Sequence, residues 1–201
     1  RTGRPLTRDS GRQIDATATG QFPIAAILSC IDSRTPAEAI FDLGLGDIFS
    51  IRIAGNITSD KVLGSLEYSC AAAGAKLILV MGHTRCGAVG AAVKFACSPE
   101  SASQATGCQH LDHIVHDIQR SVDSTTCRSI SALPAEEQQR YVDEVARRNV
   151  QMSIETVVEE SETLRRLIDE GRIAIVGGMY DVSTGAIEFL PVVTQQRVES
   201  T

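Results

Sequence analysis

The sequence Ile24-Ala-Ala-Ile-Leu-Ser-Cys-Ile-Asp-Ser-Arg34 begins as an apolar run and ends in a cluster of chemically reactive side chains. A second stretch, Leu77-Ile-Leu-Val-Met-Gly-His-Thr-Arg-Cys86, is built in the same way. Continuous apolar runs of this length are typical of strands that are buried on both faces of a parallel sheet. In such sheets, functional sites assemble where the strands end, since the strands fix the positions of the loops that follow. The two stretches therefore predict an α/β domain with a site at one edge of its sheet.

The rest of the chain extends this pattern. Periodicity and turn residues predict strands over about 23–30, 47–53, 76–81, 172–179 and 186–191, and helices over about 36–43, 60–73, 86–96, 108–122 and 134–169, the last one kinked or split. Residues 97–107 are predicted to form a surface loop, and residues 1–20 an extended or weakly helical N-terminal arm. The expected fold is a mostly parallel central β-sheet flanked by helices, with a C-terminal hairpin, in a single domain over 1–201.

Composition narrows the classes of function. The 201 residues are 43% hydrophobic and 22% charged, as in ordinary globular proteins, and the formal net charge of −6 argues against a general nucleic-acid binder. No apolar stretch approaches the roughly 18–20 residues that cross a bilayer. The polar opening, Arg1–Gly20, does not resemble a signal peptide, and the first residue is not Met. We therefore expect a cytoplasmic protein, and a chain that is processed or excised from a longer one.

The two reactive clusters together offer a tetrahedral ligand set for Zn²⁺: the side chains of Cys30, Asp32, His83 and Cys86. A closed zinc site that only stabilises the fold is one alternative, but such sites usually have four Cys or Cys/His ligands. A bidentate ion pair with Arg34 would keep the Asp32 carboxylate off the metal and leave one position open to water. Zinc with an open position lowers the pKa of bound water toward ~7, which favours the catalytic interpretation.

The remaining cysteines do not form an evident framework. Cys70 lies in an apolar helical stretch and is expected to be a small buried residue. Cys97, Cys108 and Cys127 fall in or near a polar segment and are interpreted as free thiols in a reducing compartment, with a Cys97–Cys108 bridge as the alternative.

At this point the motifs resemble those of the β-class carbonic anhydrases. The similar stretches are Cys30-Ile-Asp-Ser-Arg34, Gly46-Asp-Ile-Phe-Ser-Ile-Arg-Ile-Ala-Gly-Asn56, Gly64-Ser-Leu-Glu-Tyr68, Gly82-His-Thr-Arg-Cys-Gly-Ala-Val89 and Tyr180-Asp-Val-Ser-Thr-Gly185. They run in family order across about residues 21–190. The resemblance implies reversible hydration of CO₂ to bicarbonate and a proton, by attack of a zinc-bound hydroxide.

The resemblance also assigns roles to individual residues. It implies Cys30, His83 and Cys86 as zinc ligands, and water, hydroxide or Asp32 in the fourth position. It implies Asp32 and Arg34 as a catalytic dyad in which the carboxylate orients the attacking hydroxide. Substrate-binding positions fall on Gln21, Phe49, Ala54, Tyr68 and Gly87. Family members associate as dimers or dimers of dimers, so Gln21 and Tyr68 are expected to come from the partner chain.

Some positions depart from the family pattern. Ile53 replaces the usual Asn, which puts backbone support around the pocket in doubt. One branch has a regulatory bicarbonate pocket with a Trp three residues before the first Cys ligand. Here that position is Ile27 and the chain has no Trp, although Arg52 matches another member of that pocket.

Three alternatives concern function and context. The polar Arg1-Thr-Gly-Arg4 opening resembles carbonic-anhydrase domains attached to bacterial anion transporters of the SulP type, which would place the chain at the cytoplasmic face of a membrane. A non-catalytic zinc-binding regulatory domain of such a transporter is the main alternative function. A related hydrolase of carbon disulfide is weaker, because both Asp32 and Arg34 are retained.

Overall fold

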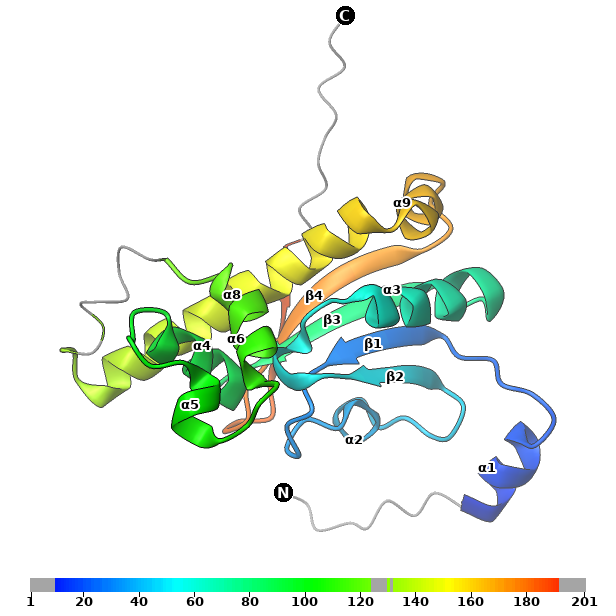
Figure 1. Ribbon diagram of the computed structural model, residues 1–201. Coiled ribbons are helices and arrows are strands. Elements are labelled where there is room, and N and C mark those ends of the chain that lie inside the picture. The colour runs from blue at the N-terminus through cyan, green and yellow to red at the C-terminus, as the bar shows by residue number, and fades with distance from the viewer. Residues whose placement is uncertain (1–9, 124–129, 131, 192–201) are drawn as a thin grey trace, which may run out of the picture.

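Five strands form one sheet in the order β2-β1-β3-β4-β5 (Figure 1). The computed structural model describes residues 10–123, 130 and 132–191. The strands are β1 Ala25–Ser29, β2 Ile48–Arg52, β3 Leu77–His83, β4 Ala174–Tyr180 and β5 Ile187–Leu190. The first four are mutually parallel, and β5 pairs antiparallel with β4. The predicted α/β class, parallel sheet and terminal hairpin are confirmed.

The two faces of the sheet are covered unequally (Figure 1). The helices are α1 Ser10–Thr17, α2 Ala37–Ile40, α3 Asp60–Glu67, α4 Gly87–Phe95, α5 Ala102–Thr106, α6 Leu111–Gln119, α8 Ala135–Glu160 and α9 Glu162–Asp169, with a 3₁₀ turn at Ala54–Asn56 and a π-helical turn at Tyr68–Ala72. Alternate strand residues point to opposite faces. Leu28 and Val80 therefore join the large core that includes α8, whereas Ile27 and Leu79 join a smaller one with α2.

Close packing of β3 against α8 fixes the end of the strand that carries His83. A Cβ atom at Gly82 would lie 2.7 Å from Cγ2 of Val150 on α8 and 2.8 Å from Sδ of Met179 on β4. Real Cβ atoms do not approach other atoms so closely, so only glycine lets the helix lie directly on the strand here. His83 consequently leaves the sheet from a tightly held backbone.

The long C-terminal helical segment is split, as predicted. Ser161, in extended conformation, ends α8 and caps α9 by accepting a hydrogen bond from the N–H of Leu164 at 3.1 Å. Its hydroxyl also donates to the Glu67 carboxylate at 2.6 Å. The break is thus a genuine helix start, and it ties α9 to α3.

The expected surface loop over 97–107 is wrong in part, because α5 lies within it. Ser101 and Gln104 form a capping box, in which each side chain bonds the other residue's backbone. The Ser-x-x-Gln spacing is visible in the sequence, but the segment lacks the apolar periodicity that would mark a helix. The capping pattern was the stronger evidence.

The cysteine interpretation needs correction. Cys97 is disulfide-bonded, so it is not a free thiol, and Cys108 is free and exposed, so the Cys97–Cys108 bridge is wrong. Cys127 lies outside the described residues. Cys70 is a free, buried thiol, as expected. Spacing could not settle these pairings, because a disulfide requires Cα atoms within about 7 Å, which only the tertiary fold determines.

The helices of the described residues were compared with the length and apolarity of membrane-spanning helices. None of them combines the length and the apolar character that a bilayer crossing demands.

Candidate metal centre

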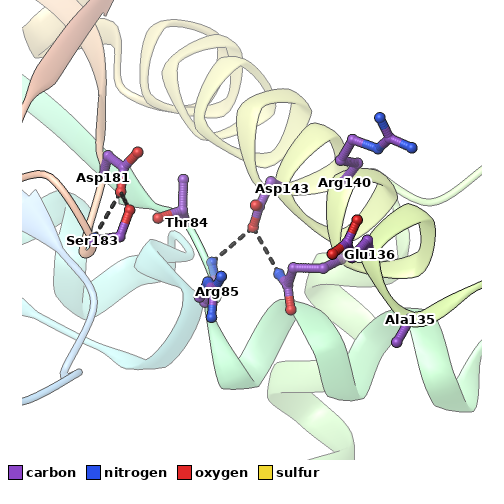
Figure 2. A pocket seen from close by; sticks show the side chains of 9 residues that line it. Thr84, Arg85, Ala135, Glu136, Arg140, Asp143, Asp181 and Ser183 are labelled. Atoms are coloured by element: carbon purple, nitrogen blue, oxygen red, sulfur yellow. Dashed lines mark hydrogen bonds between the residues drawn. The ribbon is translucent and has the colours of Figure 1, made fainter.

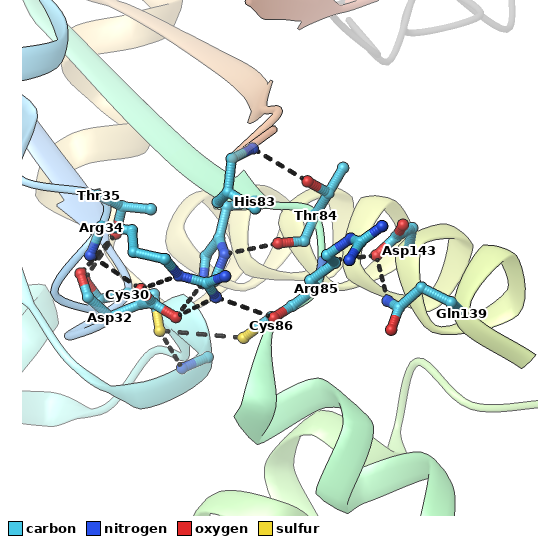
Figure 3. Close-up of polar contacts among 12 residues, drawn as sticks. Cys30, Asp32, Arg34, Thr35, His83, Thr84, Arg85, Cys86, Gln139 and Asp143 are labelled. Carbon is cyan, nitrogen blue, oxygen red and sulfur yellow. Dashed lines mark hydrogen bonds and ion pairs between the residues drawn. The ribbon is translucent and has the colours of Figure 1, made fainter. Parts of the chain in front are cut away.

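Three buried side chains from two neighbouring strand ends converge on one point (Figure 3). Cys30 follows β1, His83 ends β3, and Cys86 immediately precedes α4. Their exposed fractions are only 4%, 1% and 3%. The two Sγ atoms lie 3.9 Å apart, and one ligand atom from each residue falls within 4.8 Å of the others. The predicted juxtaposition of Cys30, His83 and Cys86 is therefore present.

The donor set fits a zinc ion. Nδ1 of His83 lies 2.9 Å from the carbonyl oxygen of Thr84, so the tautomer that protonates Nδ1 donates this bond and leaves Nε2 as a bare acceptor. Within the described structure, Nε2 is buried and makes no hydrogen bond. A buried nitrogen without a partner is costly, and coordination of a metal removes that cost. Two sulfurs and one imidazole are a ligand set that Zn²⁺ favours.

The two thiols share their proton unequally. The hydrogen bond from the Cys86 thiol, together with the one from the Gly55 amide, lowers the pKa of Cys30 despite burial. The hydrogen bond with Cys30 raises the pKa of Cys86, and burial of the thiol raises it further. Cys30 is therefore the ready-made thiolate, and metal binding releases the proton that Cys86 retains.

Asp32 and Arg34 form a bidentate pair beside this centre. Nε of Arg34 donates to Oδ1 of Asp32 at 2.9 Å, and Nη2 donates to Oδ2 at 2.7 Å. These bonds hold the pKa of the Asp32 carboxyl well below its usual range. Oδ2 also lies 3.9 Å from Nε2 of His83, so the carboxylate borders the centre while both its oxygens are engaged by the guanidinium.

Backbone contacts that the sequence did not reveal hold the first ligand loop. Arg52 donates to the carbonyl oxygens of Cys30 at 3.0 Å and Asp32 at 2.6 Å. The amide of Gly55, at φ +70°, donates to Sγ of Cys30 at 3.3 Å. The buried Asn149 amide holds that turn by donating to the Gly55 carbonyl at 2.7 Å. Together these contacts orient the first ligand.

The second ligand loop is held from α8. Arg85 has φ +57°, in the left-handed region, and its N–H donates to Oδ1 of Asp143 at 2.7 Å. Its carbonyl accepts a bond from Nη2 of Arg34 at 3.2 Å. Outside the loop lies a hollow of about 500 Å³, which we call the charged hollow; Figure 2 shows Arg85 and Asp143 in it together with Glu136, Arg140 and Asp181. None of the zinc ligands lines this hollow.

A single chain does not bring the predicted substrate-binding residues together at one place. Phe49 and Tyr68 make an edge-to-face contact at 6.0 Å and line a separate hollow of about 420 Å³, here called the aromatic hollow. Ala54 and Gly87 do adjoin the centre, next to Gly55 and Cys86 respectively. Gln21 precedes β1 and so lies at the opposite end of that strand from Cys30. Tyr68 is 57% exposed.

Comparison with known proteins now bears on this geometry. The sequence profile of the carbonic anhydrase family matches residues 25–187. The chain belongs to the β-class carbonic anhydrases. It is 35% identical over 168 residues to carbonic anhydrase 2 of Mycobacterium tuberculosis, covering 84% of this chain and 74% of that protein. It is 33% identical over 187 residues to a carbonic anhydrase of Mycolicibacterium smegmatis, covering 92% and 84%.

Solved structures agree on the fold. A β-carbonic anhydrase of Aspergillus fumigatus superimposes with a TM-score of 0.74 at 23% identity, covering 90% of this chain and 81% of that one. One of two tetrameric β-carbonic anhydrases from Sordaria macrospora gives a TM-score of 0.73 at 26% identity, covering 90% of each chain. As a carbonic anhydrase with a Cys30–His83–Cys86 triad, the chain is a zinc-dependent lyase that interconverts CO₂ and bicarbonate.

Proposed function

We propose that this carbonic anhydrase works in an open form, with Cys30, His83 and Cys86 as its zinc ligands and Asp32 held off the metal. The observation that carries this proposal is the double hydrogen bond of Arg34, which engages both oxygens of the Asp32 carboxylate. To coordinate a cation through Oδ2, the carboxylate would have to weaken or give up its charge-assisted hydrogen bond from Nη2 of Arg34. A permanently closed, purely regulatory zinc site is disfavoured for the same reason.

The residues around the centre then have distinct tasks. Bound zinc supplies a Lewis acid that lowers the pKa of water in its open position toward ~7. Asp32, kept ionised by Arg34, would accept a hydrogen bond from the attacking water or hydroxide and so point a lone pair of that nucleophile toward CO₂. Gly87, at the start of α4, offers a backbone N–H for a substrate oxygen. Ala54 supplies an apolar surface beside Gly55.

The substrate wall is completed by a second copy of the chain in this proposal. Gln21 cannot reach Cys30 of its own chain, because the full length of β1 separates them. Exposed apolar side chains near this end of β1 and around the aromatic hollow support association: Phe22 is 87% exposed, Ile24 63% and Tyr68 57%. A homodimer, or a dimer of dimers, would bring the partner's Gln21 and Tyr68 to the site beside Phe49.

Stopped-flow measurement of CO₂ hydration with the zinc-loaded, purified chain tests the open form. We expect turnover at neutral pH, together with an X-ray absorption spectrum of zinc with two sulfur and two lighter ligands. An Asp32→Asn variant should give the same spectrum with lower activity. Turnover that appears only at alkaline pH would show that Asp32 closes the site, and the proposal would fail.

A cytoplasmic location is our proposal from the sequence, yet the Cys97 disulfide weighs against it, because stable disulfides are uncommon in reducing compartments. Thiol titration of the protein from its native source would decide between them. An association with an anion transporter rests only on the polar opening of the chain, and co-purification from membranes is its test.

A further inference from the structure

The backbone of Arg85 joins α8 to the catalytic dyad. The N–H of Arg85 donates to Asp143 on one side at 2.7 Å, and its carbonyl accepts from Arg34 on the other at 3.2 Å. The same Nη2 atom of Arg34 bonds Asp32 at 2.7 Å. Figure 3 shows these groups in a row from α8 to the metal centre. We propose that Asp143 is a positioning residue of the dyad and acts on it through the backbone of Arg85.

Conformational strain gives Asp143 this influence. The left-handed region is unfavourable for a residue other than glycine, so the loop keeps Arg85 there only while its neighbours hold it. Asp143 satisfies the amide of this residue from a long helix that packs on β3 and β4. Without that acceptor, relaxation of Arg85 turns its carbonyl away from Arg34, and the guanidinium loses this hydrogen bond.

Asp143 is itself oriented. The side-chain amide of Gln139, one helical turn earlier, donates to the same Oδ1 atom at 2.9 Å. Both Asp143 and Gln139 border the charged hollow, which is lined by none of Cys30, His83 and Cys86. The effect of Asp143 on the reaction is therefore indirect, and the inference depends on the proposed role of Asp32 and Arg34.

The test compares three variants of the zinc-loaded enzyme. Asp143→Ala removes the acceptor, and kcat is expected to fall about 10- to 100-fold, the usual cost of losing an outer partner of a metal site. Asp143→Asn keeps an acceptor oxygen and should restore most of kcat. Glu136→Ala removes a carboxylate two turns away on the same face of α8 and in the same hollow, so it should leave kcat unchanged.

A measurement that does not depend on turnover accompanies these rates. Solvent exchange of the Arg34 Nε proton, followed by ¹⁵N NMR, reports how firmly the guanidinium is held. We expect faster exchange in Asp143→Ala and wild-type exchange in Glu136→Ala. If Asp143→Ala does not fold, Gln139→Ala, which removes only the orienting bond, should shift exchange and kcat in the same direction by a smaller factor. Unchanged exchange in the variant that folds would overturn the proposal.

A double variant separates this inference from the proposed function. If Asp143 acts through Arg34, Asp143→Ala should cost nothing further in an Arg34→Ala background. If the double variant lost activity by the product of the two single fold-losses, Asp143 would not act through Arg34. The proposed role of Asp32 and Arg34 would be unaffected by that result. Wild-type activity of Arg34→Ala alone would instead refute the dyad.

Discussion

The metal centre and the aromatic hollow of this enzyme are built in opposite ways. The centre is buried: its three ligands have almost no exposed surface, and backbone amides and carbonyls of the same chain orient them. The aromatic hollow is open, and Tyr68 exposes more than half of its surface. One chain thus holds all three candidate metal ligands, whereas in the proposed dimer a second copy completes the substrate wall. Substitutions in the two regions should accordingly fail in different ways.

The largest loss of activity is expected from substitutions at the buried metal centre. Cys86→Ser replaces a thiolate with a poor zinc ligand, so the protein should purify with little zinc and lose more than about 10³-fold in kcat/KM. Metal analysis and stopped-flow hydration measure this. Cys70→Ser, another buried free thiol outside the triad, is the matched control and should keep its zinc. Full zinc content in Cys86→Ser would contradict the ligand assignment.

A smaller loss is expected at the rim of the centre. Asp32→Asn retains the shape of the side chain but weakens its hold on Arg34 and on the attacking water, and kcat should fall about 10²-fold. Zinc content should stay at one per chain, which separates this variant from the ligand variants. A joint loss of zinc and activity would instead identify Asp32 as a ligand.

The open region should respond in a concentration-dependent manner. Tyr68→Asp places a charge on the exposed aromatic surface, and we expect dissociation to monomers with roughly a tenfold loss of activity per chain at low concentration. Sedimentation velocity and hydration rates over a dilution series measure both effects. His116→Asp, on the exposed face of α6, introduces the same charge and should change neither. A monomeric Tyr68→Asp with full activity would show that one chain suffices.

The smallest expected effect concerns stability. The pKa of Asp32 is lower in the folded chain than in the unfolded one, so its pair with Arg34 stabilises the fold above the unfolded pKa, about 4. That contribution is lost as the pH falls below this value. Because Arg34 is about half exposed, the stabilisation by this ion pair should not exceed about 1 kcal/mol. The difference in urea midpoint between the wild type and Asp32→Asn should shrink from about pH 6 to about pH 3; a constant difference would contradict the pairing.

The sequence was most informative where strands end. Apolar runs ahead of Cys30 and His83 predicted a parallel sheet with both clusters at one edge, because the carboxyl ends of parallel strands share an edge. The residue types in the two clusters then suggested a shared metal ion. The side chains that support the centre escaped prediction. Asn149 and Asp143 lie far along the chain on a helix whose polar residues look solvent-exposed by pattern, and they act on backbone groups that no motif identifies.

The order of the strands was likewise beyond the sequence. Spacing shows that β1, β2 and β3 follow one another, but β1 sits between the other two, and only that placement makes the strands of Cys30 and His83 direct neighbours. Long-range packing decides such an order, and local patterns carry no record of it. The pairing of Cys97 could not be predicted for the same reason: a disulfide at this residue was only the alternative, with Cys108 as the wrong partner.

Adjacent placement of β1 and β3 has a kinetic meaning as well. Some fifty residues separate the first ligand from the other two, and β2 and α3 lie between β1 and β3 along the chain, so pairing of β1 with β3 joins segments that are distant in sequence. Contacts of such long sequence separation form late and slowly. During refolding, zinc should therefore bind only once β1 and β3 have paired, so the rate of zinc binding reports the rate of this late folding step.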